Sequence, residues 1–210
     1  MSVPDTDCRL CPRLAEFRQD LRQKYPDYHN APVAAFGDAE PSLLIVGLAP
    51  GMHGANASGR PFTGDYAGIL LYKALHQTGF SSRPVSENGD DGLELHGARI
   101  TNAVKCLPPQ NKPTTLEANT CRPFLQSEID ALTSVQVILA LGTIAHRAVV
   151  LAHAGKLSDY PFSHGAEHPL AGGRTLLDSY HCSRYNTQTR RLTEEMFTAV
   201  LARAQQLALA

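Results

Sequence analysis

Four cysteines lie in two groups whose spacing is typical of a metal centre. Cys8 and Cys11 form a C-R-L-C pair near the N-terminus, and fourteen residues separate Cys106 from Cys121. Four thiolates suit either a tetrahedral zinc ion or an iron–sulfur cube, and the spacing alone does not separate the two. Single free cysteines are often small buried hydrophobes, which is the alternative for each of these residues.

A second set of polar and aromatic side chains stands just after, or at the end of, apolar segments. Its members are His53, Phe62, Asp65, Asn102 and His181. Asp65 directly precedes a predicted helix, where a carboxylate can hold a water molecule and stabilise a developing positive charge. An aspartate before a helix is also a good N-cap, and the two roles are compatible.

The apolar segments that position these residues predict strands buried on both faces. Four of them alternate with helical segments: residues 42–47, 98–104, 135–141 and 174–179. Strands that alternate with helices predict a parallel sheet. We therefore expect an α/β fold of three layers, in which a roughly four-stranded parallel sheet is flanked by helices. Since the carboxyl ends of such strands converge, the polar side chains are expected to form one composite site.

Helices are expected directly after the Cys8–Cys11 pair, over 66–77, from Thr114 to about 132, from Gly142 to about 153, and from Arg190 onward. Thr114 and Glu117 have the spacing of a capping box, which places the start of the third helix. Residues 25–42 are expected to be loop, and residues 81–97 a polar surface connection.

The whole chain has 210 residues and a formal net charge of −1, which excludes a globally basic nucleic-acid coat but not a local basic groove. One domain covering residues 1–210 is the simplest expectation. No apolar run approaches the ~20 residues of a membrane span, and the N-terminus lacks the order of a secretory signal, so we expect a cytoplasmic protein. In such a chain, the odd number of five cysteines favours metal binding or catalysis over disulfides.

Six segments spread over nearly the whole chain resemble the uracil-DNA glycosylase superfamily, and within it the iron–sulfur family 5. They are C-R-L-C, GLAPGMHGANASGRPFTGDYAG, NAVKCLPPQNKP, the helical Cys121, LALG and SYHCSRYNTQTRRLT, in the family's order. GLAP together with HGAN and FTGD is specific, whereas C-x-x-C alone is not. The resemblance implies a four-stranded parallel sheet between helices. It also implies a 4Fe–4S cluster, structural rather than redox-active, on Cys8, Cys11, Cys106 and Cys121.

The resemblance further implies an activity, the hydrolysis of the N-glycosidic bond of uracil in DNA by a monofunctional glycosylase that starts base excision repair. Its partner would be DNA containing uracil or other deaminated bases, bound by a monomer in the cytoplasm, at the nucleoid. Such an enzyme must take the base out of the stack. It must then break the C1′–N bond through a transition state with a cationic sugar and an anionic base.

Four residues match the chemical roles that this reaction requires. Asp65 matches the acidic residue to which family 5 assigns catalysis, and it would position water and stabilise the sugar cation. Phe62 would stack under the flipped base, or be an ordinary core aromatic. Asn102 would read the Watson–Crick edge of the base, or be a turn asparagine bonded to local backbone. His181 would donate to the anionic base oxygen, although a lone histidine is more often structural.

Further substrate-binding candidates come from the glycine-rich loop and the C-terminal motif: Gly47, Ala49, Gly51, His53, Ser183 and Arg184. Many superfamily members carry an acidic or polar residue after the first strand, where this chain has the apolar Leu48 and Ala49. Uracil-strict relatives have a bulky tyrosine at the position of Gly51. The glycine therefore predicts a broader range of deaminated bases, hypoxanthine included. His53 is expected to line the pocket or to contact phosphate.

The segment 181–186 occupies the place of the loop that wedges into the duplex. Cys182 stands where the family usually has proline, which predicts a looser loop and a reactive fifth thiol. Arg184 or Tyr185 would be the wedge. The alternative is a phosphate contact for Arg184 and solvent exposure for Tyr185.

Two rival functions stay open. One is a non-catalytic iron–sulfur or zinc module that binds DNA or a partner, and the presence of Asp65, Asn102 and His181 together argues against it. The other is a hydrolase for free nucleosides or nucleotides, which needs no wedge. Lys105 would permit a Schiff-base lyase. It is expected instead to support the cluster or the DNA backbone, so hydrolysis alone is predicted.

Overall fold

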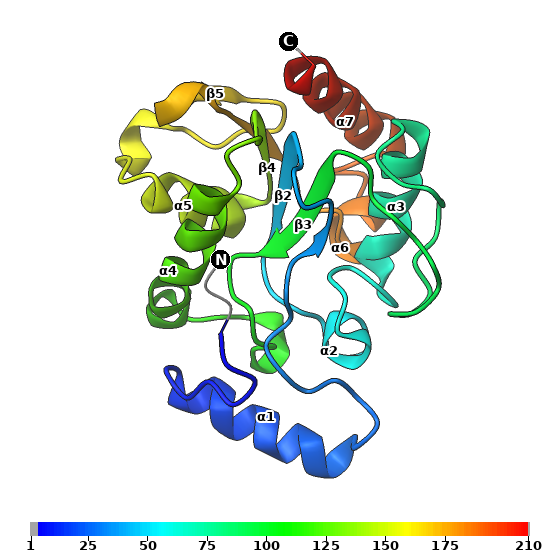
Figure 1. Ribbon diagram of the computed structural model, residues 1–210, viewed down its shortest axis with the longest axis vertical. Helices are drawn as coiled ribbons and strands as arrows, with labels where there is room; N and C mark the ends of the chain where they lie inside the picture. The colour runs from blue at the N-terminus through cyan, green and yellow to red at the C-terminus, as the bar shows by residue number, and fades with distance from the viewer. Residues whose placement is uncertain (1–3, 210) are drawn as a thin grey trace.

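The computed structural model describes residues 4–209 and is built on one mixed sheet of six strands, in the order β1-β3-β2-β4-β6-β5 (Figure 1). The four central strands run parallel: β3 (Ala98–Asn102), β2 (Leu43–Gly47), β4 (Val137–Leu141) and β6 (Thr175–Ser179). The predicted α/β class and four-stranded parallel sheet are confirmed for this central part.

Two short antiparallel strands extend the sheet at its edges and were not predicted. β1 (Phe36–Gly37) pairs with β3, and β5 (Glu167–Pro169) pairs with β6. β1 lies within the segment 25–42 that was expected to be loop. Strands this short carry no alternation of apolar and polar residues that sequence patterns could detect.

Helices cover both faces of the sheet, as the three-layer prediction requires. The helices are α1 (Pro12–Lys24), α2 (Ala55–Ser58), α3 (Tyr66–Gln77), α4 (Thr115–Ala131), α5 (Thr143–Ala152), α6 (Arg184–Gln188) and α7 (Glu194–Ala208). In Figure 1, α3 and α7 lie on one side of the sheet, α4 and α5 lie on the other, and α1 lies below both layers. Short 3-10 turns occur at Pro109–Asn111, Leu157–Asp159 and Ala171–Gly173.

The strand β2 is apolar throughout because it contributes to two cores. Leu43 and Ile45 pack in the core under α3 and α7, whereas Leu44 and Val46 pack in the core under α4 and α5. All four side chains are fully buried. Burial of both faces fixes the register of β2, and hence the direction in which the loop after Gly47 leaves the sheet.

The predicted capping box at the start of α4 is present. The Thr114 side chain accepts from the N–H of Glu117, and the Glu117 carboxylate accepts from the N–H of Thr114. The closing helix, in contrast, begins later than predicted. Arg190 has a φ of +57°, which no helix accommodates, and Thr193 caps α7 by accepting from the N–H of Met196.

The segment 81–97 is more than the surface connection that was expected. Leu93 and Leu95 are buried in the core under α3 and α7. Asp91 accepts a 2.6 Å hydrogen bond from Arg60 of the glycine-rich loop, so this segment braces the loop from behind. Within residues 4–209, no helix is long and apolar enough to span a membrane.

Candidate active site and cysteine centre

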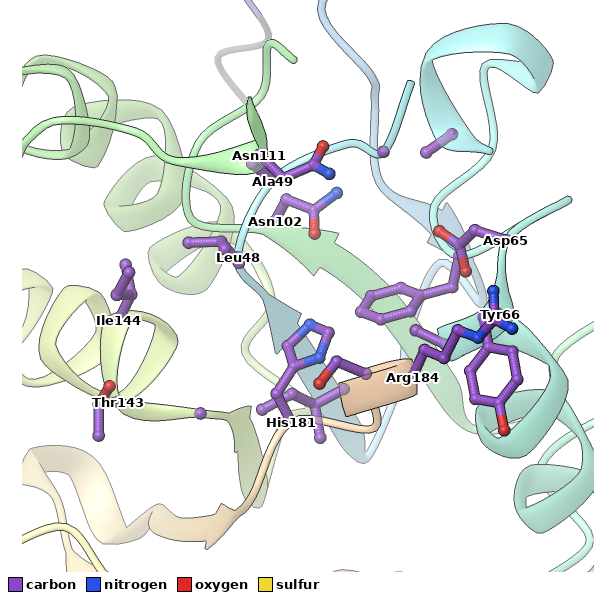
Figure 2. A pocket seen from close by; sticks show the side chains of 17 residues that line it. Leu48, Ala49, Asp65, Tyr66, Asn102, Asn111, Thr143, Ile144, His181 and Arg184 are labelled. Carbon is purple, nitrogen blue, oxygen red and sulfur yellow. The ribbon is translucent and has the colours of Figure 1, made fainter. Parts of the chain in front are cut away.

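A cavity of about 440 Å³ opens at the carboxyl ends of the parallel strands, where the composite site was expected. The predicted site residues that line it are Ala49, Gly51, Phe62, Asp65, Asn102, His181, Ser183 and Arg184. In Figure 2, the side chains of Asn102 and His181 point toward one another across the cavity. Asp65 and Arg184 lie to one side of them, and Thr143 and Ile144 lie to the other.

Asp65 is half-buried at the wall of the cavity and is also the N-cap of α3. Its Oδ1 accepts a 2.8 Å hydrogen bond from the N–H of Gly68. Burial raises the pKa of the Asp65 carboxyl, and hydrogen bonds from the backbone of Gly68 and Ala67 oppose that rise. A Cβ at Gly54 would lie only 2.8 Å from Asp65 Oδ2, so the loop backbone can approach this carboxylate closely only because residue 54 is glycine.

Phe62 and Asn102 both lie against Gly47, which was predicted to bind substrate but does not itself line the cavity. A Cβ on Gly47 would come within 2.5 Å of Asn102 Oδ1 and 2.6 Å of Phe62 Cζ, so only glycine leaves both side chains in place. Phe62 adopts a φ of +56°, an uncommon conformation for a non-glycine residue that concentrates at functional sites. Asn102 is 2% exposed, and its Oδ1 has no hydrogen-bond partner among residues 4–209.

His181 packs against the ring of Phe62, with ring centroids 6.0 Å apart and planes inclined by 29°. Burial lowers the pKa of His181 to about 4, so the ring is neutral at neutral pH. Its buried Nδ1 has no hydrogen-bond partner within the described part of the chain. A buried polar atom without a partner is costly, which marks both Nδ1 and the Oδ1 of Asn102 as positions where a ligand would bind.

His53 lies outside the cavity. It is exposed, its Nδ1 lies 2.9 Å from the Tyr28 hydroxyl, and its ring contacts Tyr25 edge-on. The lining role expected for His53 therefore has no support in the geometry. Gly51, in contrast, faces open space, because a Cβ there would meet only Asp65 Oδ2, at 3.5 Å.

Other residues that line the cavity were not predicted from the sequence. They include Leu48, Tyr66, Asn111, Thr143 and Ile144. Asn111 belongs to the proline-rich loop between Cys106 and Cys121, and it adopts a φ of +56°. Asparagine tolerates this left-handed conformation better than most residues, so N-K-P after two prolines was the available signal for a turn that presents a side chain.

The segment expected to form the wedge is the start of α6 rather than an irregular loop. Ser183 caps α6 by accepting from the N–H of Asn186. Arg184 lies over the ring of Tyr66, 5.7 Å from its centroid, and Tyr185 is 71% exposed. Cys182 is fully buried in the core, and burial raises the pKa of its thiol. The expectation of a loose loop and a reactive thiol was therefore wrong, because Cys182 anchors the segment and its thiol does not ionise readily.

The four other cysteines converge on one pocket from three distant parts of the chain. Cys8, Cys11, Cys106 and Cys121 all line it, together with apolar side chains that include Leu14, Val104 and Phe124. Arg18 donates to Cys106 Sγ at 3.7 Å, and the N–H of Lys105 donates to Cys121 Sγ at 3.4 Å. Burial raises the pKa of the Cys106 thiol to about 12. Four sulfurs in an apolar shell with N–H donors aimed at them form a suitable metal centre.

Lys105 is buried beside this pocket and does not line the cavity. Its Nζ donates to Thr101 Oγ1 and to Glu128 Oε2, both at 2.5 Å. The side chains of Lys105 and Glu128 are exposed by only 1% and 4%. The amine is therefore engaged in a buried ion pair and is not presented to a substrate.

A family model described as the uracil DNA glycosylase superfamily matches residues 34–205. The chain therefore belongs to this superfamily, as its motifs predicted. That match covers the whole sheet and every residue lining the cavity.

Similar proteins that are named as type-5 enzymes identify the branch of the superfamily as type 5. The type-5 uracil-DNA glycosylase of Thermus thermophilus is 52% identical over 209 residues, covering 97% of this chain and 94% of that protein. The corresponding protein of Mycobacterium leprae is 42% identical over 220 residues, covering 99% and 96%. That of Pyrobaculum aerophilum is 40% identical over 202 residues, covering 94% and 88%. The resemblance to family 5 is thereby confirmed.

Proposed function

We propose that this chain is a monofunctional DNA glycosylase that hydrolyses the N-glycosidic bond of uracil in DNA. The observation that carries the proposal is the convergence of Asp65, Asn102 and His181 on one cavity whose floor is Phe62. The type-5 names of relatives at 40–52% identity support the same reaction. The enzyme would act on DNA as a monomer in the cytoplasm, where the nucleoid lies.

The base would be held by three side chains around the cavity floor. The face of Phe62 offers a stacking surface, as aromatic rings do for extruded bases. Asn102 Oδ1 accepts from an imide N–H of uracil, which supplies the partner that this buried oxygen lacks. The neutral ring of His181 donates one N–H to a base oxygen as negative charge develops there. A neutral histidine can do so because one of its two ring nitrogens still carries a hydrogen.

Asp65 would act on the sugar side of the bond. A carboxylate near C1′ stabilises the cationic sugar and orients the attacking water. The cap to α3 fixes the direction of the carboxylate, so no reorganisation is needed when the charge appears. Leu48 and Ala49 also line the cavity and are apolar. Among residues 4–209, Asp65 is therefore the carboxylate that lines the cavity and can take this role.

The range of bases follows from the space at Gly51. Because a Cβ there meets only the Asp65 carboxylate, at 3.5 Å, the cavity accepts bases larger than uracil. We include hypoxanthine in the proposed range. Comparing single-turnover excision of uracil and hypoxanthine from otherwise identical duplexes tests this, and strict uracil specificity would contradict it.

The cysteine centre is proposed to hold a 4Fe–4S cluster on Cys8, Cys11, Cys106 and Cys121. Four cysteines supply the complete ligand set of a cube, and the apolar pocket that they line suits a cluster that is screened from solvent. The type-5 names of the relatives support an iron–sulfur cluster over a single zinc ion at this site. The cluster would serve structure, joining α1 to the loop after β3 and to α4.

A single-turnover assay on uracil-containing duplex decides between this function and a non-catalytic DNA-binding module, which would release no base. Comparing the rates of base release from free deoxyuridine and from the duplex separates this function from that of a nucleoside hydrolase. A nucleoside hydrolase would act faster on the free nucleoside, whereas we expect faster release from the duplex. The exposed Tyr185 follows the cavity-lining Arg184 in the chain, so it is suited to fill the gap left by an extruded base, which supports the duplex as substrate.

A further inference from the structure

A separate group of potential metal ligands lies at the sheet edge beneath α5. It consists of His146 on α5, His168 on β5 and Asp178 on β6, with one ligand atom from each lying within 4.8 Å of the others. Their side chains are exposed by only 3%, 12% and 0%. None of the three lines the cavity or the cysteine pocket, so the proposed reaction gives them no role.

The hydrogen bonds of His146 require a proton or a metal ion beside Asp178. His146 Nε2 lies 2.9 Å from the carbonyl oxygen of Tyr160, which can only accept, so this nitrogen carries the hydrogen. In a neutral ring, Nδ1 then carries a lone pair, and it lies 2.8 Å from Asp178 Oδ1. Since two lone pairs at this distance repel, either a proton lies between the two atoms or both bind one metal ion.

His168 and Asp178 make a second contact that a proton on His146 cannot satisfy. Asp178 Oδ2 lies 3.4 Å from His168 Nε2, and neither buried atom has a hydrogen-bond partner among residues 4–209. This separation matches the ~3.4 Å between two ligand atoms of tetrahedral zinc at bond lengths of about 2.1 Å, and the 2.8 Å between His146 Nδ1 and Asp178 Oδ1 would widen by about 0.6 Å when both bind the ion. One metal ion would satisfy His146 Nδ1, His168 Nε2 and the carboxylate together, whereas a proton satisfies only the first contact.

The ligand types and their surroundings select the kind of metal. Two imidazoles and one carboxylate suit zinc and its neighbours, whereas magnesium and calcium prefer oxygen ligands alone. The bond from His146 Nε2 to the Tyr160 carbonyl is the kind of outer contact that orients a metal-bound histidine. The ring of Phe162 packs on His146, and that of Tyr160 packs on His168, which limits access of water.

We propose that His146, His168 and Asp178 bind a divalent transition-metal ion of the zinc type. The ion links α5 to the antiparallel pair of β5 and β6. It thereby closes a loop of the chain between residues 146 and 168. β5 has only three residues and forms the edge of the sheet. A metal bond there adds stability where backbone pairing is short.

Metal analysis of the protein with its cysteine centre loaded tests the site directly. The protein is incubated with Zn²⁺ alone and desalted, and zinc and iron are then measured in the same sample by mass spectrometry. We expect about one zinc ion per chain in the wild type. We expect His168→Gln to lose that zinc with its iron unchanged. His96→Gln, at an exposed position outside the group, is the matched control and should keep both metals.

Thermal unfolding gives a second readout, in which each protein is compared with itself before and after metal is removed or added. Chelation with EDTA should lower the Tm of the wild type and of His96→Gln, and added Zn²⁺ should restore it. The Tm of His168→Gln should respond to neither. Equal zinc in wild type and His168→Gln, or a wild-type Tm indifferent to both EDTA and Zn²⁺, overturns the proposal. A proton between His146 Nδ1 and Asp178 Oδ1 would then account for their 2.8 Å contact.

Discussion

Asp65 Oδ1 accepts a 2.8 Å hydrogen bond from the N–H of Gly68, so the carboxylate at the cavity wall is also the residue that caps α3. Two opposing effects act on the pKa of this carboxyl. Burial raises the pKa of its carboxyl, while the backbone N–H groups at the helix start favour the charged form. Capping and catalysis are therefore separable only by a substitution that keeps the shape and removes the charge.

Asp65→Asn is that substitution. The amide oxygen still accepts from Gly68, so the unfolding free energy should stay the same or rise slightly, because no charge is buried. The excision rate should fall roughly 10²–10⁴-fold. Asp65→Ala should lose the same activity and, in addition, about 1 kcal/mol of stability with the cap. Urea denaturation and single-turnover excision check both variants. A fully active Asp65→Asn would remove Asp65 from the chemistry.

His181 should make stability depend on pH. Burial lowers its pKa from 6.5 to about 4, so the folded chain binds fewer protons than the unfolded chain between those values. The unfolding free energy contributed by the neutral ring is therefore fully present above pH 6.5 and is lost as pH falls toward about 4. In His181→Gln, the dependence of the unfolding free energy on pH between these two values should lose the part that comes from His181. Denaturation curves across this range measure it, with iron content followed in parallel. Identical slopes would contradict the burial argument.

Gly51→Tyr should narrow the range of substrates. A ring placed at this open position would occupy the space beside Asp65 that a larger base needs. We expect hypoxanthine excision to fall at least ~10-fold more than uracil excision, since a clash with the larger base discriminates against it without affecting the smaller one. Rates for the two bases in the same duplex context check this. An equal loss for both bases would indicate general damage to the loop.

Borohydride should trap no covalent complex between the protein and uracil-containing DNA. The Lys105 amine is bound to Glu128 and Thr101 and lies outside the cavity, so it cannot form a Schiff base. Lys105→Met should destabilise the fold by roughly 3–5 kcal/mol, because it leaves the Glu128 carboxylate buried without its partner. Gel analysis and urea denaturation measure the two effects. A trapped complex that depends on Lys105 would refute hydrolysis alone.

Cys106→Ser should lower the iron content of the protein, because Cys106 lines the cysteine pocket. Cys182→Ala is the matched control, since this buried cysteine belongs to the core and not to the pocket. It should keep its iron and lose only the stability that goes with a small cavity. Iron analysis and the visible absorbance of the purified proteins distinguish the two. Equal iron in both variants would exclude Cys106 as a ligand.

The central sheet and most of the cavity could be predicted because their signals are local. Buried strands such as β2 appear as continuous apolar runs, and the direction of a parallel sheet then brings Asp65, Asn102 and His181 to one edge. The side chain of His53 could not be placed in this way. Which way a loop residue points depends on its tertiary neighbours, here Tyr25 and Tyr28, and these precede the first long strand.

Asn111 and the ligand group around Asp178 were missed for a different reason. Asn111 reaches the cavity from a loop whose course is set by residues 106–121, and the preceding strand does not determine it. His146, His168 and Asp178 come from three different elements, a helix and two strands, and β5 has no detectable pattern. Contacts that depend on such pairings are not encoded in any one segment.

The bare backbone of Gly47 has a practical consequence for judging variants of this chain. Any side chain there would displace both an aromatic ring and an amide, so a change as small as an added methyl group should disable the protein with every reactive group intact. A survey of natural sequences that scores only the carboxylate, the amide and the imidazole would count such a chain as competent. A substitution at a position without a reactive side chain can thus abolish function.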